Sequence, residues 1–152
     1  MLKAKDIMTR DVITVKPSTT IEELAHLLIE HRISGAPVVD EQGDLVGIVT
    51  ENDLITQNRR LHIPTVVRLF DAFIMIESQS KLEEEIRKMA GVIVDDICSK
   101  KPITVTGDTS AEDIATIMHD KKVHLIPVVE GKKIQGIIGK IDLIEGIRKG
   151  SS

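Results

Sequence analysis

Apolar and polar residues follow a strand-like pattern and a helix-like pattern in turn along the first third of this chain. A short β-branched run, Val12–Val15, predicts a strand. Two later apolar runs, 36–39 and 45–50, flank a turn at Gly43 and predict a hairpin. A helix through Asp53 follows, so the predicted order is βαββα. The first helix has apolar residues at helical spacing, namely Ile21, Leu24, Ala25 and Leu28.

The same order of elements recurs about 90 residues later, and the shift becomes 89 after a deletion of one residue in a turn. Ile103–Val105 predicts the strand, 125–129 and 134–138 predict a hairpin around Gly131, and a helix runs through Asp142. The apolar positions of its first helix are Ala111, Ile114, Ala115 and Met118. Because matching residues keep one order, the chain contains an internal duplication.

Two capping boxes predict where the first helix of each copy begins. They are Thr19-x-x-Glu22 and Thr109-x-x-Glu112. Neither copy is large enough to cover both faces of its sheet, so we expect an α+β fold in which two βαββα repeats pack together. The predicted organisation is one module over residues 1–152, with repeat one at about 5–57, a helical insertion at about 58–93 and repeat two at about 95–148.

The segment between the repeats is long for a linker and carries helical signals. Pro64 suits the first turn of a helix, and Ser80-x-x-Glu83 resembles another capping box. The apolar residues after Pro64 are Val66, Val67, Leu69, Phe70, Phe73 and Ile74. Two interpretations remain open: a helical hairpin that covers the module's own core, or a helical contribution to a homodimer.

Composition narrows the functions that these repeats can have. The net charge is −4 and the pI is near 5.7, which argues against a nucleic-acid polymer as partner. Phe70 and Phe73 are the only aromatic residues, so a bound ring would contact aliphatic side chains. Cys98 is alone, which excludes an internal disulfide and a cysteine-built metal site. We see no signal peptide or membrane span and expect a cytoplasmic protein.

Two motifs resemble a known family. Residues 31–40 read His-Arg-Ile-Ser-Gly-Ala-Pro-Val-Val-Asp, and residues 47–53 read Gly-Ile-Val-Thr-Glu-Asn-Asp. Placed after Asp6–Thr9 and Ile13–Val15, they resemble the cystathionine-beta-synthase (CBS) domain family, and the whole chain resembles a stand-alone CBS pair. The resemblance implies a pseudo-twofold pair of repeats, a homodimer, and binding of AMP, ADP, ATP or S-adenosylmethionine. It also implies regulation of a partner protein rather than catalysis.

Asp53 and Thr50 suit the ribose of such a ligand. One carboxylate can accept hydrogen bonds from two neighbouring hydroxyls, and Thr50 can add a hydroxyl contact. Both residues could instead satisfy backbone N–H groups at the start of a helix. We expect Gly47 to keep the turn between strand and ligand tight.

The resemblance further implies two clefts, each formed by both repeats. The first would combine Thr50, Asp53, Thr104, Val123, His124, Ile126 and Pro127. The second would combine Thr9, Thr14, Arg32, Ile33, Ser34, Ala36, Pro37 and Asp142. Arg32 and His124 are the first candidates to contact phosphate. Gly139 stands where the first repeat has Thr50, so a hydroxyl is missing and we predict the Asp53 cleft to be the stronger.

Two other functions compete with ligand sensing. Against an enzyme, the chain has no Gly-rich phosphate loop, no zinc-ligand spacing and no recognisable nucleophile–base pair, so we expect no catalytic residues, metal or cofactor. The second competitor is a structural dimerisation or interaction module with vestigial clefts, for which Gly139 is a small argument.

Overall fold

The computed structural model describes residues 1–60 and 92–150 of the chain. The described residues form two compact units that do not coincide with the two repeats. Unit 1 contains residues 1–14, 39–47 and 100–150, and unit 2 contains residues 15–38, 48–60 and 92–99. The expected helical insertion lies largely outside the described residues.

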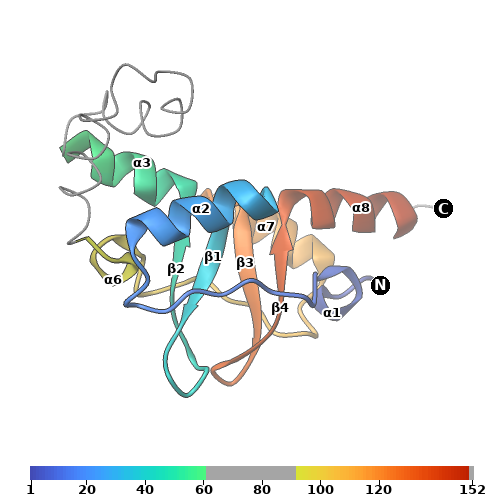
Figure 1. Ribbon diagram of the computed structural model, residues 1–152. Coiled ribbons are helices and arrows are strands. Elements are labelled where there is room, and N and C mark those ends of the chain that lie inside the picture. Colours follow the sequence, from blue (N-terminus) through green and yellow to red (C-terminus); the bar gives the residue numbers. More distant parts are fainter. Residues whose placement is uncertain (61–91, 151–152) are drawn as a thin grey trace. The chain divides into compact units, whose positions relative to one another are not determined.

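Unit 1 consists mainly of the second repeat. Its elements are α1 (Ala4–Ile7), α7 (Ala111–Lys121), β3 (Leu125–Glu130), β4 (Lys133–Gly139) and α8 (Lys140–Gly150). β3 and β4 form an antiparallel hairpin in which Ile126 pairs with Ile138 and the register shifts after Val128 (Figure 1). Gly131 at the turn has a φ of +63°, a conformation that glycine adopts without steric cost. The predicted second hairpin is therefore confirmed.

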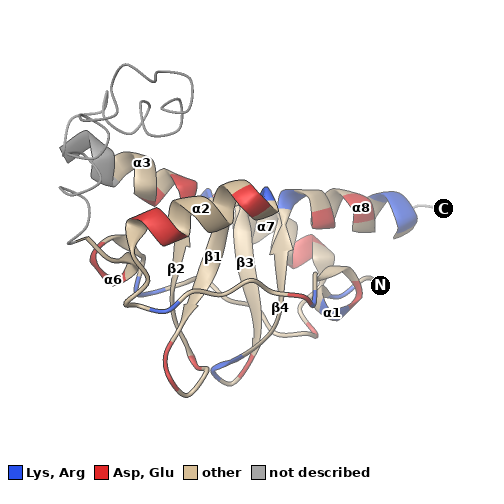
Figure 2. Cartoon of the chain, in the orientation of Figure 1, with Lys and Arg blue, Asp and Glu red and all other residues tan. Residues whose placement is uncertain are grey.

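Unit 2 consists mainly of the first repeat. Its elements are α2 (Ile21–His31), most of β1 (Gly35–Val39), the second half of β2 (Leu45–Thr50), α3 (Glu51–Arg60) and α6 (Val94–Ile97). β1 and β2 pair in a two-stranded sheet, and α3 contacts α2 and α6. In Figure 2 the strands carry few charged residues, whereas acidic and basic residues lie in the hairpin turns and along the helices. All five residues of β1 are buried, whereas buried positions in β2 alternate with half-buried ones over its second half.

Each unit has its own aliphatic core, as the helical spacing predicted. Leu24 and Leu28 of α2 are buried with Val38 and Val49 in unit 2. Ile114 and Met118 of α7 are buried with Ile126, Val128 and Ile138 in unit 1. Cys98 is half-buried against the core of unit 2, where its side chain packs as a small apolar group.

The expected first strand of each repeat is shorter than predicted. Of residues 12–15 only Val15 pairs, in a parallel bridge with Val38, and of residues 103–105 only Val105 pairs, with Val128. A β-branched run favours a strand only where a sheet edge lies beside it. Here only one residue of each segment, Val15 or Val105, pairs with a strand.

The N-cap of each of the helices α2 and α7 lies one residue after the threonine of the predicted capping box. The N-cap residues are Thr20 and Ser110, whose hydroxyls accept hydrogen bonds from the backbone N–H of Glu23 and Asp113 at 3.1 Å. The hydroxyl of Thr19 instead accepts a hydrogen bond from Lys16 N–H at 2.9 Å. Thr109 does the same for Thr106 at 3.1 Å. Both threonines therefore close the turn that precedes the helix.

The leading segment of each repeat belongs to the unit formed mainly by the other repeat. In unit 1, Ala4 N–H donates to the carbonyl of Thr109 at 2.7 Å, and α1 contacts α7, α8 and β4. In unit 2, Val94 N–H donates to the carbonyl of Thr19 at 2.8 Å. Ala4 and Val94 are completely buried. Neither core is therefore complete within one repeat.

Surface charges add to the contacts of the first segment in unit 1. Asp108 lies 3.4 Å from the ammonium of Lys5 and 3.7 Å from that of Lys3. The hydrogen bond and positive charge of Lys5, assisted by Lys3, lower the pKa of Asp108. All three side chains are well exposed, so the cluster is a weak, salt-sensitive contact.

Candidate functional site

In unit 2 the candidate site forms where β2 ends and α3 begins. Thr50 is the last residue of β2, and Asp53 lies in the first turn of α3. Asp53 Oδ2 accepts a hydrogen bond from the Thr50 backbone N–H at 2.9 Å and one from the Thr50 hydroxyl at 3.4 Å. The next backbone N–H, that of Glu51, donates to the carbonyl of Ser34 at 2.7 Å. We call Thr50 and Asp53 the Asp53 half-site.

This geometry fits both interpretations of Asp53. One carboxylate oxygen caps the backbone at the helix start, as a structural residue would. Within residues 1–60 and 92–150, Asp53 Oδ1 makes no hydrogen bond, and the side chain is half-buried. The second oxygen therefore remains available to accept hydrogen bonds from a ligand.

In unit 1 the equivalent position is held by Asp142, in the first turn of α8. Asp142 Oδ2 accepts a hydrogen bond from Gly139 N–H at 2.8 Å, and Asp142 Oδ1 accepts one from the Thr9 hydroxyl at 3.0 Å. Thr9 is held beside β4 by two backbone hydrogen bonds with Ile137, at 2.8 and 2.9 Å. We call Thr9, Gly139 and Asp142 the Asp142 half-site.

The Asp142 half-site corrects one premise of the sequence analysis. Gly139 does lack the hydroxyl that Thr50 supplies in the first repeat, but Thr9 provides a hydroxyl to Asp142 from another segment. Ser99 is the counterpart of Thr9, and its backbone pairs with Ile48 at 2.9 and 3.0 Å. The ranking of the Asp53 cleft above the Asp142 cleft stays a prediction, now without its original argument.

The glycines of the two motifs lie at a different place from the one expected. Gly47 and Gly136 lie inside β2 and β4, not in the turn that leads to the acidic residue. A Cβ on Gly136 would lie 2.5 Å from Met8 Sδ and 3.0 Å from Met8 Cβ. Glycine is therefore needed in β4 because the segment after α1 packs directly on the strand.

Four of the predicted wall residues have side chains in the interior. Ala36 and Ile126 belong to the cores of units 2 and 1, and Pro37 and Pro127 are also completely buried. The carbonyls of both prolines accept hydrogen bonds from Val15 and Val105, at 3.0 and 3.1 Å. The sequence could not separate core from wall here, because both uses require apolar residues.

The remaining predicted contacts are accessible. Ser34, His124, Thr14 and Thr104 are exposed, and Ile33 and Val123 are half-buried beside the cores of their units. A Cβ on Gly139 would lie 4.0 Å from the carbonyl oxygen of His124, so that backbone adjoins the Asp142 half-site. The structure thus brings Thr50 and Asp53 together, and Thr9 and Asp142 together. The predicted combination of each acidic residue with residues of the other repeat stays a prediction.

Arg32 has an unusual backbone that the sequence did not signal. It ends α2 in the left-handed conformation, with φ 52°, and Lys122 ends α7 in the same way, with φ 55°. Both side chains are exposed. Each repeat therefore presents a cationic residue at a position where glycine or asparagine is more common.

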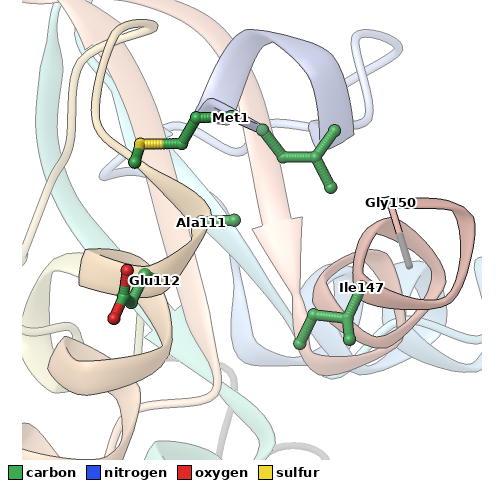
Figure 3. A pocket seen from close by; sticks show the side chains of 6 residues that line it. Met1, Ala111, Glu112, Ile147 and Gly150 are labelled. Carbon is green, nitrogen blue, oxygen red and sulfur yellow. The ribbon is translucent and has the colours of Figure 1, made fainter.

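A pocket of about 540 Å³ lies elsewhere in unit 1. Figure 3 shows its lining at the start of the chain, the first turn of α7 and the end of α8. The lining residues are Met1, Leu2, Ala111, Glu112, Ile147 and Gly150. None of the predicted site residues lines it.

The described residues contain neither a candidate metal site nor a candidate membrane span. No group of three or more His, Cys, Asp or Glu side chains within them could hold a metal ion. None of their helices is long and apolar enough to cross a membrane.

These features define a class of protein: a mixed α/β module with a duplicated βαββα unit and one acidic half-site per unit. The family described as CBS domain matches residues 4–59 and 94–149. The chain belongs to the CBS domain family, so the fold class inferred from the tandem motifs is confirmed.

Relatives of known sequence or structure support this assignment. The CBS domain-containing protein CBSX1, chloroplastic, of Arabidopsis thaliana is 31% identical over 150 residues, which cover 91% of this chain and 61% of CBSX1. A crystal structure of CBSX2 in complex with AMP matches with 26% identity, full coverage of both chains and a TM-score of 0.76. CBSX2 also comes from Arabidopsis thaliana.

A third similar protein carries other adenosyl ligands. The CBS domain pair of protein MJ0100, in complex with 5′-methylthioadenosine and S-adenosyl-L-methionine, matches with 26% identity and a TM-score of 0.71. The match covers 100% of this chain and 99% of that one. The chain spans 61% and 60% of the lengths of CBSX1 and CBSX2.

Proposed function

We propose that this chain is a non-catalytic regulatory module that binds an adenine nucleotide or another adenosyl ligand and signals to a partner protein. The observation that carries the proposal is that Asp53, held at the start of α3 by Thr50, keeps one carboxylate oxygen without a hydrogen bond to any other described residue. A ribose offers two adjacent hydroxyl donors, and a carboxylate oriented by the backbone accepts both without further ordering.

The ligands of similar proteins support the adenosyl class. AMP occupies the CBSX2 structure, and 5′-methylthioadenosine and S-adenosylmethionine occupy the MJ0100 structure. These ligands share the adenosine ribose and differ in the group attached to it. Exposed Arg32 and His124 remain our candidates to contact a phosphate, and Ile33 and Val123 our candidates to contact the base.

Calorimetric titration with AMP, ADP, ATP and S-adenosylmethionine tests this function. We expect saturable binding of at least one ligand, weakened roughly tenfold to a hundredfold by Asp53→Asn, which corresponds to the loss of a charge-assisted hydrogen bond. The substitution is well matched, because an asparagine oxygen can still accept from Thr50 N–H. Asp11→Asn removes the same charge from an exposed residue outside the site and should leave affinity unchanged.

The titration also separates the two half-sites. Binding lost in Asp53→Asn but kept in Asp142→Asn would support the predicted ranking, and the reverse pattern would contradict it. If none of the four ligands binds to the unmodified protein, and none raises its melting temperature, the sensing function is wrong.

A structural dimerisation module is the second candidate, and a specific surface favours it. Ile141, Ile144 and Ile147 of α8 are 72, 60 and 53% exposed. An apolar stripe of this kind is typical of a protein–protein contact, and we propose a homodimer. Sedimentation of the unmodified protein and of Ile144→Asp tests it: a monomer in both cases would exclude that dimer.

The partner and the setting belong to the same proposal. Ligand binding can pass a signal only if the ligand has different affinities for two states of the module. Hydrogen exchange with and without saturating ligand would detect such a shift, and identical exchange would contradict it. We also propose that the protein is cytoplasmic. Its single cysteine, Cys98, is consistent with the reducing conditions of that compartment.

A further inference from the structure

We propose that Thr9 is the positioning residue of the Asp142 half-site and makes it competent for a ligand with adjacent hydroxyls. The inference rests on the proposed function and deepens it, because it assigns the missing role of Thr50 in the second repeat to a residue of the first. Thr9 acts through Asp142 rather than through the ligand's base or phosphate.

The first argument is the division of hydrogen bonds on the carboxylate. Gly139 N–H binds Asp142 Oδ2 at 2.8 Å, and the Thr9 hydroxyl binds Asp142 Oδ1 at 3.0 Å. Bonds to both oxygens fix the rotation of the carboxylate about its terminal torsion, which is broad when unconstrained. Among the described residues, Asp53 in contrast is held through Oδ2 alone.

The second argument is how firmly Thr9 itself is held. Its N–H donates to the Ile137 carbonyl at 2.8 Å, and its carbonyl accepts from Ile137 N–H at 2.9 Å. Both bonds place Thr9 against β4, the strand that leads directly into α8. The hydroxyl donor is therefore anchored to the same framework as the acceptor.

The third argument concerns what remains for a ligand. A carboxylate oxygen can accept more than one hydrogen bond, so Asp142 Oδ1 can still accept a ribose hydroxyl. Asp142 Oδ2, which accepts from Gly139 N–H, can likewise accept the neighbouring hydroxyl. The carboxylate that Thr9 holds thus offers two adjacent acceptors in a fixed geometry, which lowers the ordering cost of binding.

Unit 2 provides a matched control. Ser99 is the counterpart of Thr9 and has the same backbone pairing, with Ile48. Among the described residues its hydroxyl makes no bond to Asp53, which uses Thr50 instead. Removal of the hydroxyl should therefore weaken ligand binding at the Asp142 half-site when it is made at residue 9, and should not do so when it is made at residue 99.

The test compares Thr9→Val, Thr9→Ser and Ser99→Ala, each in an Asp53→Asn background so that binding reports the Asp142 half-site. AMP and ATP are titrated beside their 2′,3′-dideoxy analogues. We expect Thr9→Val to weaken AMP or ATP binding about threefold to tenfold, the range of one hydrogen bond, and to reduce the preference for the ribose form. Thr9→Ser should restore both, and Ser99→Ala should change neither.

A second readout needs no ligand. The Gly139 amide reports the Asp142 carboxylate directly, so Thr9→Val should shift its NMR resonance and speed its hydrogen exchange while the melting temperature stays close to that of the parent. Equal losses of affinity for the ribose and dideoxy forms, with an unchanged Gly139 amide, would overturn the positioning role.

The remaining outcomes separate this inference from the proposed function. If the unmodified protein binds AMP or ATP but the Asp53→Asn protein binds neither, the Asp142 half-site is not a ligand site and the inference is wrong, while the proposed function stands. If the unmodified protein binds none of the four adenosyl ligands, the proposed function fails and the inference fails with it.

Discussion

At the scale of single residues, Arg32 and Lys122 have a left-handed backbone conformation that is unfavourable for residues with a side chain. Left-handed backbone costs an L-amino acid roughly 1–2 kcal/mol, and glycine avoids this cost. The helices α2 and α7 nevertheless both end at a residue with a long, positively charged side chain. Conformational strain that recurs at equivalent positions is a reason to suspect a role in binding.

Replacing Lys122 with glycine should therefore stabilise the protein. We expect Lys122→Gly to raise the free energy of unfolding by about 0.5–1 kcal/mol, because the relief of left-handed strain exceeds the added chain entropy. His119→Gly, three residues earlier within α7, should lower it by about 1 kcal/mol. Urea denaturation of both variants tests the opposite signs, and destabilisation by both would show that Lys122 is not strained.

The two half-sites differ in how far the sequence alone could predict their contacts. Thr50 and Asp53 are three positions apart, so their contact follows from local geometry, although the motif predicted only that both residues belong to one site. Thr9 and Asp142 are 133 positions apart. Their hydrogen bond depends on how α1 and the segment after it dock on β4, which no local pattern encodes. The resemblance to the CBS family, and no local spacing, predicted that both residues belong to one site.

At the scale of elements, glycines allow the first segment of the chain to lie close to β4 and α8. Gly136 faces Met8, and a Cβ on Gly146 of α8 would collide with Cγ2 of Ile7. Both glycines are buried. Backbone approaches of this kind leave no room for even one methyl group, because protein interiors are closely packed.

Gly136→Ala should loosen this contact. We expect a loss of about 1–3 kcal/mol of stability, since the new methyl group would meet Met8 Cβ as well as the flexible end of that side chain. Met8→Ala should recover part of the loss in the double variant, which a double-mutant cycle measured by denaturation would reveal. Strictly additive effects would mean that Met8 is not the obstacle.

Helix starts illustrate a limit at the same scale. Consecutive hydroxyl residues, Thr19–Thr20 and Thr109–Ser110, offer two possible caps in each repeat. The carbonyls of Thr19 and Thr109 bind Val94 and Ala4, which are distant in sequence. These two backbone hydrogen bonds form only in the tertiary structure. In both repeats they occur together with capping by the second hydroxyl residue, Thr20 or Ser110.

At the scale of the whole molecule, the repeat is the unit of sequence but not the unit of packing. Each core takes a short helix from the leading segment of the other repeat, α1 in unit 1 and α6 in unit 2. Neither repeat can therefore complete its core without a segment of the other repeat.

A reciprocal pair of variants tests this exchange. Ala4→Asp introduces a charge into the core of unit 1, and Val94→Asp does so in unit 2. Each should cost several kcal/mol, because an unpaired charge is buried. Hydrogen exchange should lose protection first in α7 and α8 for Ala4→Asp, and in α2 and α3 for Val94→Asp. Loss confined to the repeat that carries each substitution would contradict the exchange.

The sequence by itself determined the duplication, the hairpins with their turn glycines, the helical core positions and the local pair of Thr50 and Asp53. These features depend on side-chain periodicity and on contacts within a few residues, which the order of amino acids specifies directly. Only the tertiary structure decided which hydroxyl caps each helix, which apolar residues are core, which segment completes each core, and that Thr9 supplies the hydroxyl that Gly139 lacks. Those outcomes depend on backbone groups brought together from distant segments, and their distances are set by packing rather than by spacing along the chain.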